Sequence, residues 1–307
     1  PGASPGARGS PPLLKEVAGA VAATAALGAA TAAYGHFIEL NNFQLRTESL
    51  PVLPAGSPDF RILHISDMHM IPGQQKKIDF MHSLAALEPD LVMNTGDNLS
   101  HVDGMGPLLE ALDPLMDFPG VFVPGSNCYF APVFKNPARY LWQPRTPQMI
   151  EEGSRVALPI ERMHEAFESR GWTGLVNRYD TLNLKGLRLE CSGVDDPHLR
   201  YDEHPGFAPG AFDEGNEPSI RIGVAHAPYM RTLHRFVQDG AQAIFAGHTH
   251  GGQVCLPGGH ALVSNCDLPP SRAKGVSEQS GIPVQVSAGL GTSRFAPVRL
   301  FCPPEAI

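Results

Sequence analysis

The sequence predicts a layered α/β fold in which helices enclose sheets. Short apolar runs bounded by glycine or polar residues alternate with amphipathic stretches through the middle of the chain, and strand-like segments cluster toward its end. The composition agrees, because 42% of the 307 residues are hydrophobic and 18% are charged, as in globular proteins. A chain of this length can bury one large core or two modest ones.

Each element of this fold follows from a local pattern. Residues 37–53 alternate apolar and polar side chains, which predicts an edge strand. Apolar runs predict core strands at residues 59–66, 90–97, 120–126, 221–226 and 241–247. Two adjacent runs predict a hairpin at residues 181–193. Amphipathic stretches predict helices at residues 76–89, about 108–116, 160–171 and 230–240. Strand and loop are expected in the last third of the chain.

Residues 1–36 differ from the rest and form a membrane-associating or signal-like segment. Val17–Gly35 carries no charged residue, and its length suits one bilayer crossing or the apolar region of an export signal. Its many Ala, Gly and Thr residues leave an interfacial or docked helix as alternatives. Arg8 and Lys15 precede it, which places the amino terminus inside and the main domain, residues 37–307, outside.

Charge and cysteine content exclude some classes of function. A net charge of −8 argues against a nucleic-acid partner, since a phosphate backbone requires a basic face. The five cysteines are scattered and form no C-x-x-C pair, so neither a zinc knuckle nor a disulfide framework is indicated.

Four predicted core strands end in residues that bind metals. In open α/β sheets such strand ends converge on one site. Mixed Asp and His ligands suit Mn, Fe or Zn better than Mg. Six ligands would leave no open position around one ion, so we expect two divalent metal ions bridged by a carboxylate. The six residues are Asp67 and His69 in ISDMH, Asp97 in TGDN, His226 in VAHAP, and His248 and His250 in AGHTH.

The ordered motifs D-x-H, G-D, a G-N-H-like turn, H and G-H-x-H resemble the calcineurin-like metallophosphoesterases. GHTHGGQ, GVDDPH and SAGLGTSRFAPVRLFCPPE are similar to the membrane-associated bacterial branch of that superfamily, and the resemblance covers roughly residues 60–305. It implies a four-layer α/β/β/α sandwich, here with an amino-terminal apolar helix and a cap insertion at about 129–159. Residues 37–307 would then be the metallophosphoesterase domain.

The resemblance also assigns the ligands. Two cations would acidify a bridging water and clamp the phosphate for in-line attack. By position, the first ion would be bound by Asp67, His69 and His250. Asp97 would bridge the two ions, and the second ion would be bound by His226 and His248.

The turn PGSNCYF departs from the family pattern G-N-H-[DE]. Aligned without a gap, Ser126 replaces the ligand Asn, Asn127 the catalytic His and Cys128 the acid. If Ser126 is an insertion, Asn127 remains a ligand of the second ion and Cys128 stands where the His belongs. We prefer Asn127 as a ligand, because an amide oxygen is the expected donor there. Either way the leaving-group His is missing, a loss worth about 10²–10⁴-fold in rate.

Cys128 has several interpretations at this stage. It is a small buried filler, a ligand, an introduced substitution, or a thiol that two cations would ionise and make prone to alkylation or oxidation. Asn98 is a candidate donor to a phosphate oxygen, or a residue that stabilises its turn. His101, His198 and His204 are candidates for a replacement acid, against the alternative of surface histidines.

The insertion at about 129–159 mixes basic and aromatic residues. Such a mixture suits a cap that grips an anionic headgroup and lies against acyl chains, or an ordinary Pro-rich loop. The sequence therefore predicts a membrane-associated bacterial phosphoesterase with an extracytoplasmic catalytic domain and a phosphorylated amphiphile, such as a phospholipid, as substrate. Two rivals remain: a metal-binding pseudoenzyme that recognises a phosphorylated ligand, and a soluble nucleotide phosphodiesterase.

Overall fold

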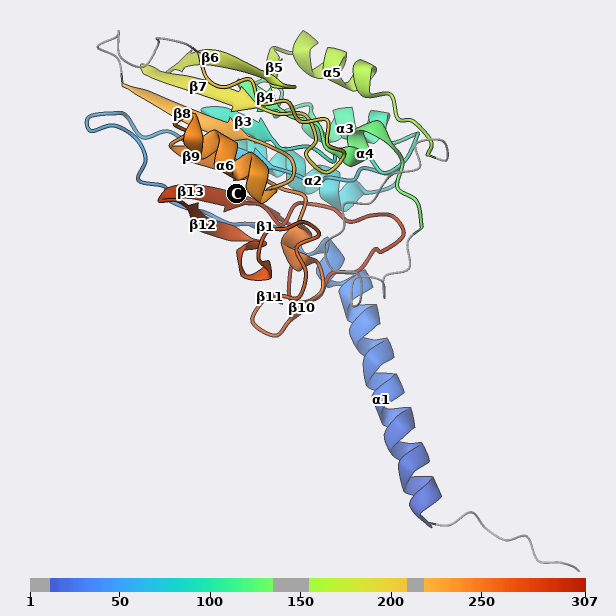
Figure 1. Ribbon diagram of the computed structural model, residues 1–307. Helices are drawn as coiled ribbons and strands as arrows, with labels where there is room; N and C mark the ends of the chain where they lie inside the picture. The colour runs from blue at the N-terminus through green and yellow to red at the C-terminus, as the bar shows by residue number, and fades with distance from the viewer. Residues whose placement is uncertain (1–11, 135–154, 209–217) are drawn as a thin grey trace, which may run out of the picture.

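The computed structural model describes residues 12–134, 155–208 and 218–307, and within them two sheets form the body of the molecule (Figure 1). The smaller sheet is fully parallel and has the strand order β2-β3-β4-β5. Its strands are Ile62–Ile65 (β2), Leu91–Asn94 (β3), Gly120–Phe122 (β4) and Trp172–Gly174 (β5). The three-residue β5 is too short for the sequence to have indicated it.

The larger sheet has the order β12-β13-β9-β8-β7-β6. Its central strands are parallel, while β6 and β12 pair antiparallel with their neighbours at the two edges. The hairpin expected at 181–193 is confirmed as β6 and β7. The strands are Arg178–Leu184 (β6), Leu187–Gly193 (β7), Ser219–Val224 (β8), Ala243–Ala246 (β9), Gly275–Gln279 (β12) and Ile282–Val286 (β13).

Helices cover the outer face of each sheet, which confirms the sandwich of four layers (Figure 1). Phe167 packs from one helix against Phe122 of the smaller sheet, with ring centroids 5.2 Å apart, and Phe236 from another helix belongs to one buried cluster with Ile244 of the larger sheet. The helices on the smaller sheet are Gln75–Ser83 (α2), Met105–Leu112 (α3) and Ile160–Ser169 (α5). The helix on the larger sheet is Met230–Gln238 (α6).

Strand β3 shows why the core strands read as unbroken apolar runs. Val92 faces the helices, whereas Leu91 and Met93 face the second sheet, and all three are fully buried. A strand covered on both faces has no solvent side, so the alternation of polar residues disappears.

The prediction of a long edge strand at 37–53 is wrong. The chain there forms a 3-10 turn at Glu39–Asn41 and only the two-residue strand β1 (Gln44–Leu45), which pairs with β14 (Glu305–Ala306). The reason is Glu39, whose buried carboxylate accepts a hydrogen bond from the backbone N–H of Cys302. This side-chain contact turns the chain where a strand ladder would have kept it extended.

The predicted amino-terminal apolar helix is present as α1 (Pro12–Phe37) and extends away from the body (Figure 1). Glu16–Asn41 is long and apolar enough to cross a membrane, by length and composition. Its end is attached to the body through one backbone and one side-chain contact. The Gly35 carbonyl accepts from the Arg299 N–H at 3.2 Å, and His36 Nδ1 lies 2.7 Å from the Pro297 carbonyl.

Candidate metal centre

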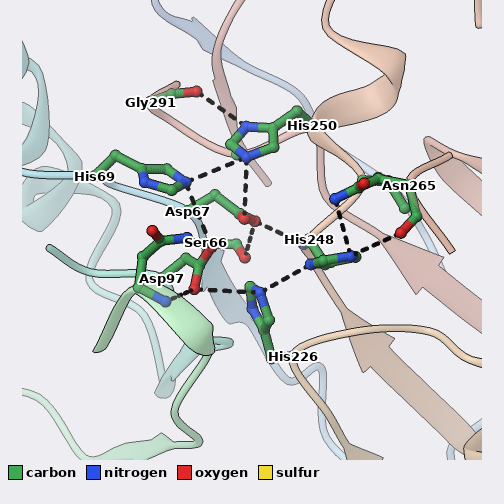
Figure 2. A network of polar contacts seen from close by, with 12 residues as sticks. Ser66, Asp67, His69, Asp97, His226, His248, His250, Asn265 and Gly291 are labelled. Atoms are coloured by element: carbon green, nitrogen blue, oxygen red, sulfur yellow. Dashed lines mark hydrogen bonds and ion pairs between the residues drawn. The ribbon is translucent and has the colours of Figure 1, made fainter. Parts of the chain in front are cut away.

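The Asp and His residues that follow β2, β3, β8 and β9 gather at one place, beyond the carboxyl ends of these strands (Figure 2). Among the described residues they form two groups whose potential ligand atoms lie within 4.8 Å of one another. The first group is Asp67, His69 and His250, and the second is Asp67, Asp97 and His226. The convergence predicted from the four strand ends is what the fold produces.

The distances within the first group suit a shared ion. His69 Nε2 lies 3.2 Å from His250 Nε2, and His250 Nε2 lies 3.6 Å from Asp67 Oδ1. Asp67 Oδ1 is buried and has no hydrogen-bond partner among the described residues. A buried carboxylate oxygen without a donor is strongly unfavourable, and a cation at this position would satisfy it.

Asp67 belongs to both groups, and Asp97, a member of the second group, also faces the first. Asp97 Oδ2 lies 3.5 Å from His69 Nε2, and its Oδ1 lies 3.4 Å from His226 Nε2. His248 adjoins the second group, because its Nδ1 lies 3.3 Å from His226 Nε2. One carboxylate thus faces both groups, which is the geometry of a bridging ligand.

Backbone carbonyls orient two of these histidines. His226 Nδ1 lies 2.7 Å from the Thr95 carbonyl, and His250 Nδ1 lies 3.1 Å from the Gly291 carbonyl. A carbonyl only accepts, so in each ring Nδ1 carries the hydrogen and the lone pair of Nε2 points into the centre.

The other two histidines are held in the same way from outside. His69 Nδ1 lies 2.8 Å from the Ser100 hydroxyl. His248 is turned around, with its Nε2 3.2 Å from the Asn265 carbonyl and its Nδ1 facing the centre. All four rings therefore direct one nitrogen inward and bind protein with the other, as ligand histidines do.

The charges of the centre also favour a cation. Burial raises the pKa of Asp67 to about 6, and it lowers the pKa of His69 to about 4 and that of His250 well below its usual value. Neutral imidazoles offer the lone pair that metal binding requires. Burial opposes charge on His226, but Asp97 and Asp67 outweigh it and raise its pKa to about 10, so these carboxylates demand a positive charge.

Five candidate ligands adopt left-handed backbone angles, which non-glycine residues rarely do. Their φ values are 49° for Asp67, 46° for His69, 51° for Asp97, 69° for His248 and 50° for His250. Such conformations cost about 1–3 kcal/mol each and concentrate at functional sites. The strain here coincides with the residues that the sequence singled out.

Two glycines let the backbone approach the carboxylates. A Cβ at Gly125 would overlap Asp97 Oδ1, and a Cβ at Gly247 would overlap the Ser66 hydroxyl and Asp67 Oδ2. The glycine before the G-H-x-H pair is thus required by close packing against the centre.

The unusual turn forms the short helix α4 (Ser126–Tyr129) beside Asp97. The backbone N–H and Nδ2 of Asn127 donate to Oδ1 and Oδ2 of Asp97, both at 2.7 Å. Asn127 therefore lies against the bridging candidate, and it lines the cavity described below together with Ser126.

Cys128 faces away from the centre into the core, where it is fully buried. Its Sγ accepts from the backbone N–H groups of Gly125 and Asn98, each at 3.5 Å. In a capping box, the side chain of the third helical residue accepts a hydrogen bond from the backbone N–H of the N-cap residue. Cys128 holds this position, where an acidic side chain is usual. The geometry favours the alignment without a gap, in which Cys128 replaces the acid.

The expectation of an ionised, accessible thiol at Cys128 is wrong. Its side chain has no exposed surface, and burial raises its pKa to about 12. The expectation that Asn98 donates to phosphate is wrong as well. Its Nδ2 points into the core at 3.7 Å from Cys128 Sγ and 3.8 Å from Met163 Sδ, so Asn98 supports the turn.

The three histidines considered as replacement acids separate in space. His204 Nδ1 lies 3.1 Å from Asp239 and His101 Nδ1 lies 3.6 Å from Asp103, both away from the cavity. His198 alone of the three lines the cavity.

His198 also contacts a candidate ligand. Its ring centroid is 4.7 Å from that of His248, and its Nδ1 lies 2.9 Å from the Tyr229 hydroxyl. The motif GVDDPH, which contains His198, was the sequence signal that could have assigned this residue to the site. Arg299 gave none: its fully buried guanidinium donates to the carbonyls of Ala288 and Gly291 and so supports the loop behind His250.

A cavity of about 550 Å³ opens over the centre. Its lining combines candidate ligands with a set of apolar residues, which we call the apolar wall. Residues of that apolar wall include Phe130, Ala131, Pro132, Val133, Val254, Leu262, Phe295 and Ala296. Of the predicted cap, residues 135–154 lie outside the described residues, while its two ends pair through the Ala131 N–H and the Val156 carbonyl at 2.8 Å.

An α/β/β/α sandwich that gathers Asp and His at its strand ends is suited to metal-dependent hydrolysis. Residues 60–252, more than half of the chain, match the family described as calcineurin-like phosphoesterase. The chain belongs to this family and is a metal-dependent phosphoesterase.

The chain is also similar to individual proteins. The chain is 27% identical over 215 residues to the uncharacterized protein YpbG of Bacillus subtilis (strain 168), a match that covers 68% of this chain and 69% of that protein. It is 23% identical over 317 residues to the uncharacterized metallophosphoesterase YkuE of the same organism, covering 95% and 94%. The crystal structure of TT1561 of Thermus thermophilus is similar at a TM-score of 0.41 and 11% identity, covering 76% and 91%.

Proposed function

We propose that the protein binds two divalent metal ions and hydrolyses a phosphate ester of an amphiphilic lipid at a membrane surface. The position of Asp97 carries the dinuclear part of the proposal. Its two carboxylate oxygens face different groups, at 3.5 Å from His69 Nε2 and 3.4 Å from His226 Nε2. A single ion would not need a carboxylate held between two sets of ligands.

In this proposal the ligands divide between the two ions and a bridge. The donor set of carboxylate and imidazole suits Mn, Fe or Zn better than Mg. The bound ions supply a nucleophile from water at neutral pH and neutralise the phosphate charge. The first ion would be bound by Asp67, His69 and His250, and Asp97 would be the bridge. The second ion would be bound by His226 and His248.

The chain's own residues set what this centre does well. The outer hydrogen bonds of the histidines keep the ligand nitrogens in place before substrate arrives. Asn127 stands beside Asp97 where the family has a proton donor, and an amide does not donate a proton as an acid near neutral pH. We therefore expect esters with acidic leaving groups to react faster than esters of alkyl alcohols.

The apolar wall of the cavity supports a lipid as substrate. Val254, Leu262 and Phe295 are between 41% and 52% exposed and line the same cavity, and an exposed apolar patch of this kind is typical of a ligand or membrane contact. This wall continues to the base of α1, because Gln253 donates to the Ala296 carbonyl and the neighbouring Pro297 contacts His36. A substrate held in a bilayer beside α1 would reach the cavity along this apolar wall.

The same arrangement supports a location at the bacterial membrane with the catalytic domain outside the cytoplasm. The helix Glu16–Asn41 has the length and composition of a membrane span, and the two basic residues before it favour this orientation. Cell fractionation, with protease added to intact cells, tests both statements. Protection of the catalytic domain from that protease would contradict the orientation.

The decisive experiment is turnover of a panel of phospholipids in vesicles and soluble nucleotide esters with Mn, Fe, Zn and Mg, with metal content measured in parallel. We expect two ions per chain and faster turnover of lipid esters. Preferred hydrolysis of nucleotides would contradict the lipid proposal. Full metal binding without turnover of any ester would favour the pseudoenzyme alternative, which Asn127 at the position of the proton donor motivates.

Leu262→Asp tests the apolar wall directly. Leu262 is 52% exposed, so its replacement should leave the fold and the metal content unchanged. We expect slower turnover of vesicle lipids with unchanged turnover of a soluble aryl phosphate ester. Leu256→Asp is the matched control, because Leu256 is 51% exposed and does not line the cavity.

A further inference from the structure

Two thiols, Cys255 and Cys302, lie together directly behind the turn that carries His250. Cys255 begins the short strand β10 (Cys255–Leu256), and Cys302 follows a segment that runs beside it. Val254 and Leu300 form a parallel bridge, and the Cys255 N–H donates to the Leu300 carbonyl at 2.9 Å. The two segments are therefore hydrogen-bonded neighbours at the level of both cysteines.

The side chains converge as well as the backbones. Cys255 Sγ lies 3.2 Å and Cys302 Sγ lies 3.6 Å from the same atom, the Gly251 carbonyl oxygen. The two thiols share one small buried cluster with Ala288. Each is less than 5% exposed.

The other cysteines lie apart from this pair. They belong to three different buried clusters: Cys128 between the smaller sheet and its helices, Cys191 between the two sheets, and Cys266 beneath α6. Among the five thiols, the fold thus brings one particular pair into contact.

We propose that Cys255 and Cys302 are a cross-linking site and form a disulfide bond that clamps the back of the metal centre. Both S–H bonds break and one S–S bond forms, and the two protons are taken up by the reduced oxidant. Two electrons pass to an external disulfide, such as oxidised glutathione or the disulfide of a thiol oxidase, which becomes two thiols. The inference rests on the geometry of the pair and does not depend on the substrate.

The position of the cross-link explains what it would do. The chain between the two cysteines includes Asn265 and Gly291, whose carbonyls bind the outer nitrogens of His248 and His250. It also includes Arg299, which donates to the Cys302 carbonyl at 3.1 Å and to Gly291 at 2.7 Å. Closing this segment into a loop reduces the freedom of the unfolded chain and holds these partners in place.

Thiol trapping on the full chain tests the cross-link. Native protein is equilibrated in glutathione buffers from reducing to oxidising, denatured, alkylated with iodoacetamide and digested for mass spectrometry. A second sample is unfolded and refolded in the same buffers, so that burial cannot prevent exchange. We expect a Cys255–Cys302 peptide pair two hydrogens lighter than the free peptides, with the other three cysteines alkylated.

Alkylation of both thiols in every buffer, in the native and the refolded sample alike, would overturn the proposal. A cross-link that joins other cysteines would also overturn it.

Serine variants test the clamp. Oxidised wild-type protein should melt roughly 5–10 °C above the reduced protein. It should also lose metal to a chelator at least several-fold more slowly. Cys255→Ser and Cys302→Ser should remove both differences, whereas Cys266→Ser, a buried cysteine of another cluster, should keep them. Equal melting and equal metal loss in oxidised and reduced wild type would contradict the clamp.

Discussion

The two halves of the candidate metal centre are built with different regularity. On one side, Asp67, His69 and His250 follow the family pattern, and each histidine has an outer partner that fixes its orientation. On the other side, the short helix α4 places Ser126, Asn127 and Cys128 where the pattern expects other residues. The backbone of α4 nevertheless keeps its contacts, because Cys128 Sγ accepts the N–H groups that an acid would accept.

Within this one turn, the hydrogen bonds that hold the backbone in place are therefore independent of the side chain that would transfer a proton. The hydrogen bonds that shape α4 survive with a neutral sulfur as the acceptor, although such bonds are weaker than those to a carboxylate. The group that would transfer a proton does not survive, since an amide stands there. The first half of the centre is therefore expected to tolerate change poorly, and the second half is expected to be improvable.

Asp97→Ala should have the largest effect, because its carboxylate faces both halves. We expect loss of both ions in elemental analysis and loss of measurable turnover. His69→Ala is the comparison and should mainly weaken one ion, since His69 faces one group. Retention of two ions in Asp97→Ala would end the interpretation of this residue as a bridge.

Asn127→His tests the second half and should increase activity. If Asn127 occupies the place of the family's proton donor, the variant should raise kcat by roughly 10²-fold on esters with poor leaving groups. Esters with acidic leaving groups need no proton and should change little. A loss of the second ion without any gain in rate would instead identify Asn127 as a ligand and favour the alignment with an insertion.

Ser100→Ala probes the support of the first half. Its hydroxyl lies 2.8 Å from His69 Nδ1, and loss of an outer partner typically weakens metal binding by about 10–100-fold. Competition with a chelator measures this affinity. Ser192→Ala is the matched control, since Ser192 is also fully buried but lies in β7. Equal affinities of the two variants would show that Ser100 does not orient His69.

Cys128→Asp probes the support of the second half and should act more weakly. Two backbone N–H groups, from Gly125 and Asn98, are already directed at this position, so a carboxylate would accept two charge-assisted hydrogen bonds. We expect turnover and affinity for the second ion to rise by about tenfold. Cys128→Ser should stay near the wild type, and equal values for all three proteins would make the residue inert filler.

A chain that starts at Phe37 should show the smallest change at the centre. It loses α1 and two contacts of its end, from Gly35 and His36, which lie outside the two groups of candidate ligands. Metal content and turnover of soluble esters should be retained, while turnover of vesicle lipids should fall. Loss of metal in this shortened chain would show that α1 belongs to the folded core.

Local sequence was enough for the layers and for the convergence of the ligands. A core strand such as β3 is recognised from its own residues, and a parallel strand brings its carboxyl end to the same edge as its neighbours. The positions of Asp67, Asp97 and His226 directly after apolar runs therefore predicted that they would meet. The alternation at residues 37–53 led to a wrong prediction, because local periodicity contains no sign of the hydrogen bond between the buried Glu39 carboxylate and the Cys302 N–H.

Only the tertiary structure decided which way the remaining side chains face. Asn98 and Cys128 lie next to candidate site residues in sequence, yet they point into the core, because the left-handed backbone at Asp97 and the turn of α4 rotate them away. The outer partners of the histidines, such as Gly291, and the buried cluster of Cys255 with Cys302 join segments far apart in the chain. No local pattern encodes such contacts, since they arise from how whole layers pack.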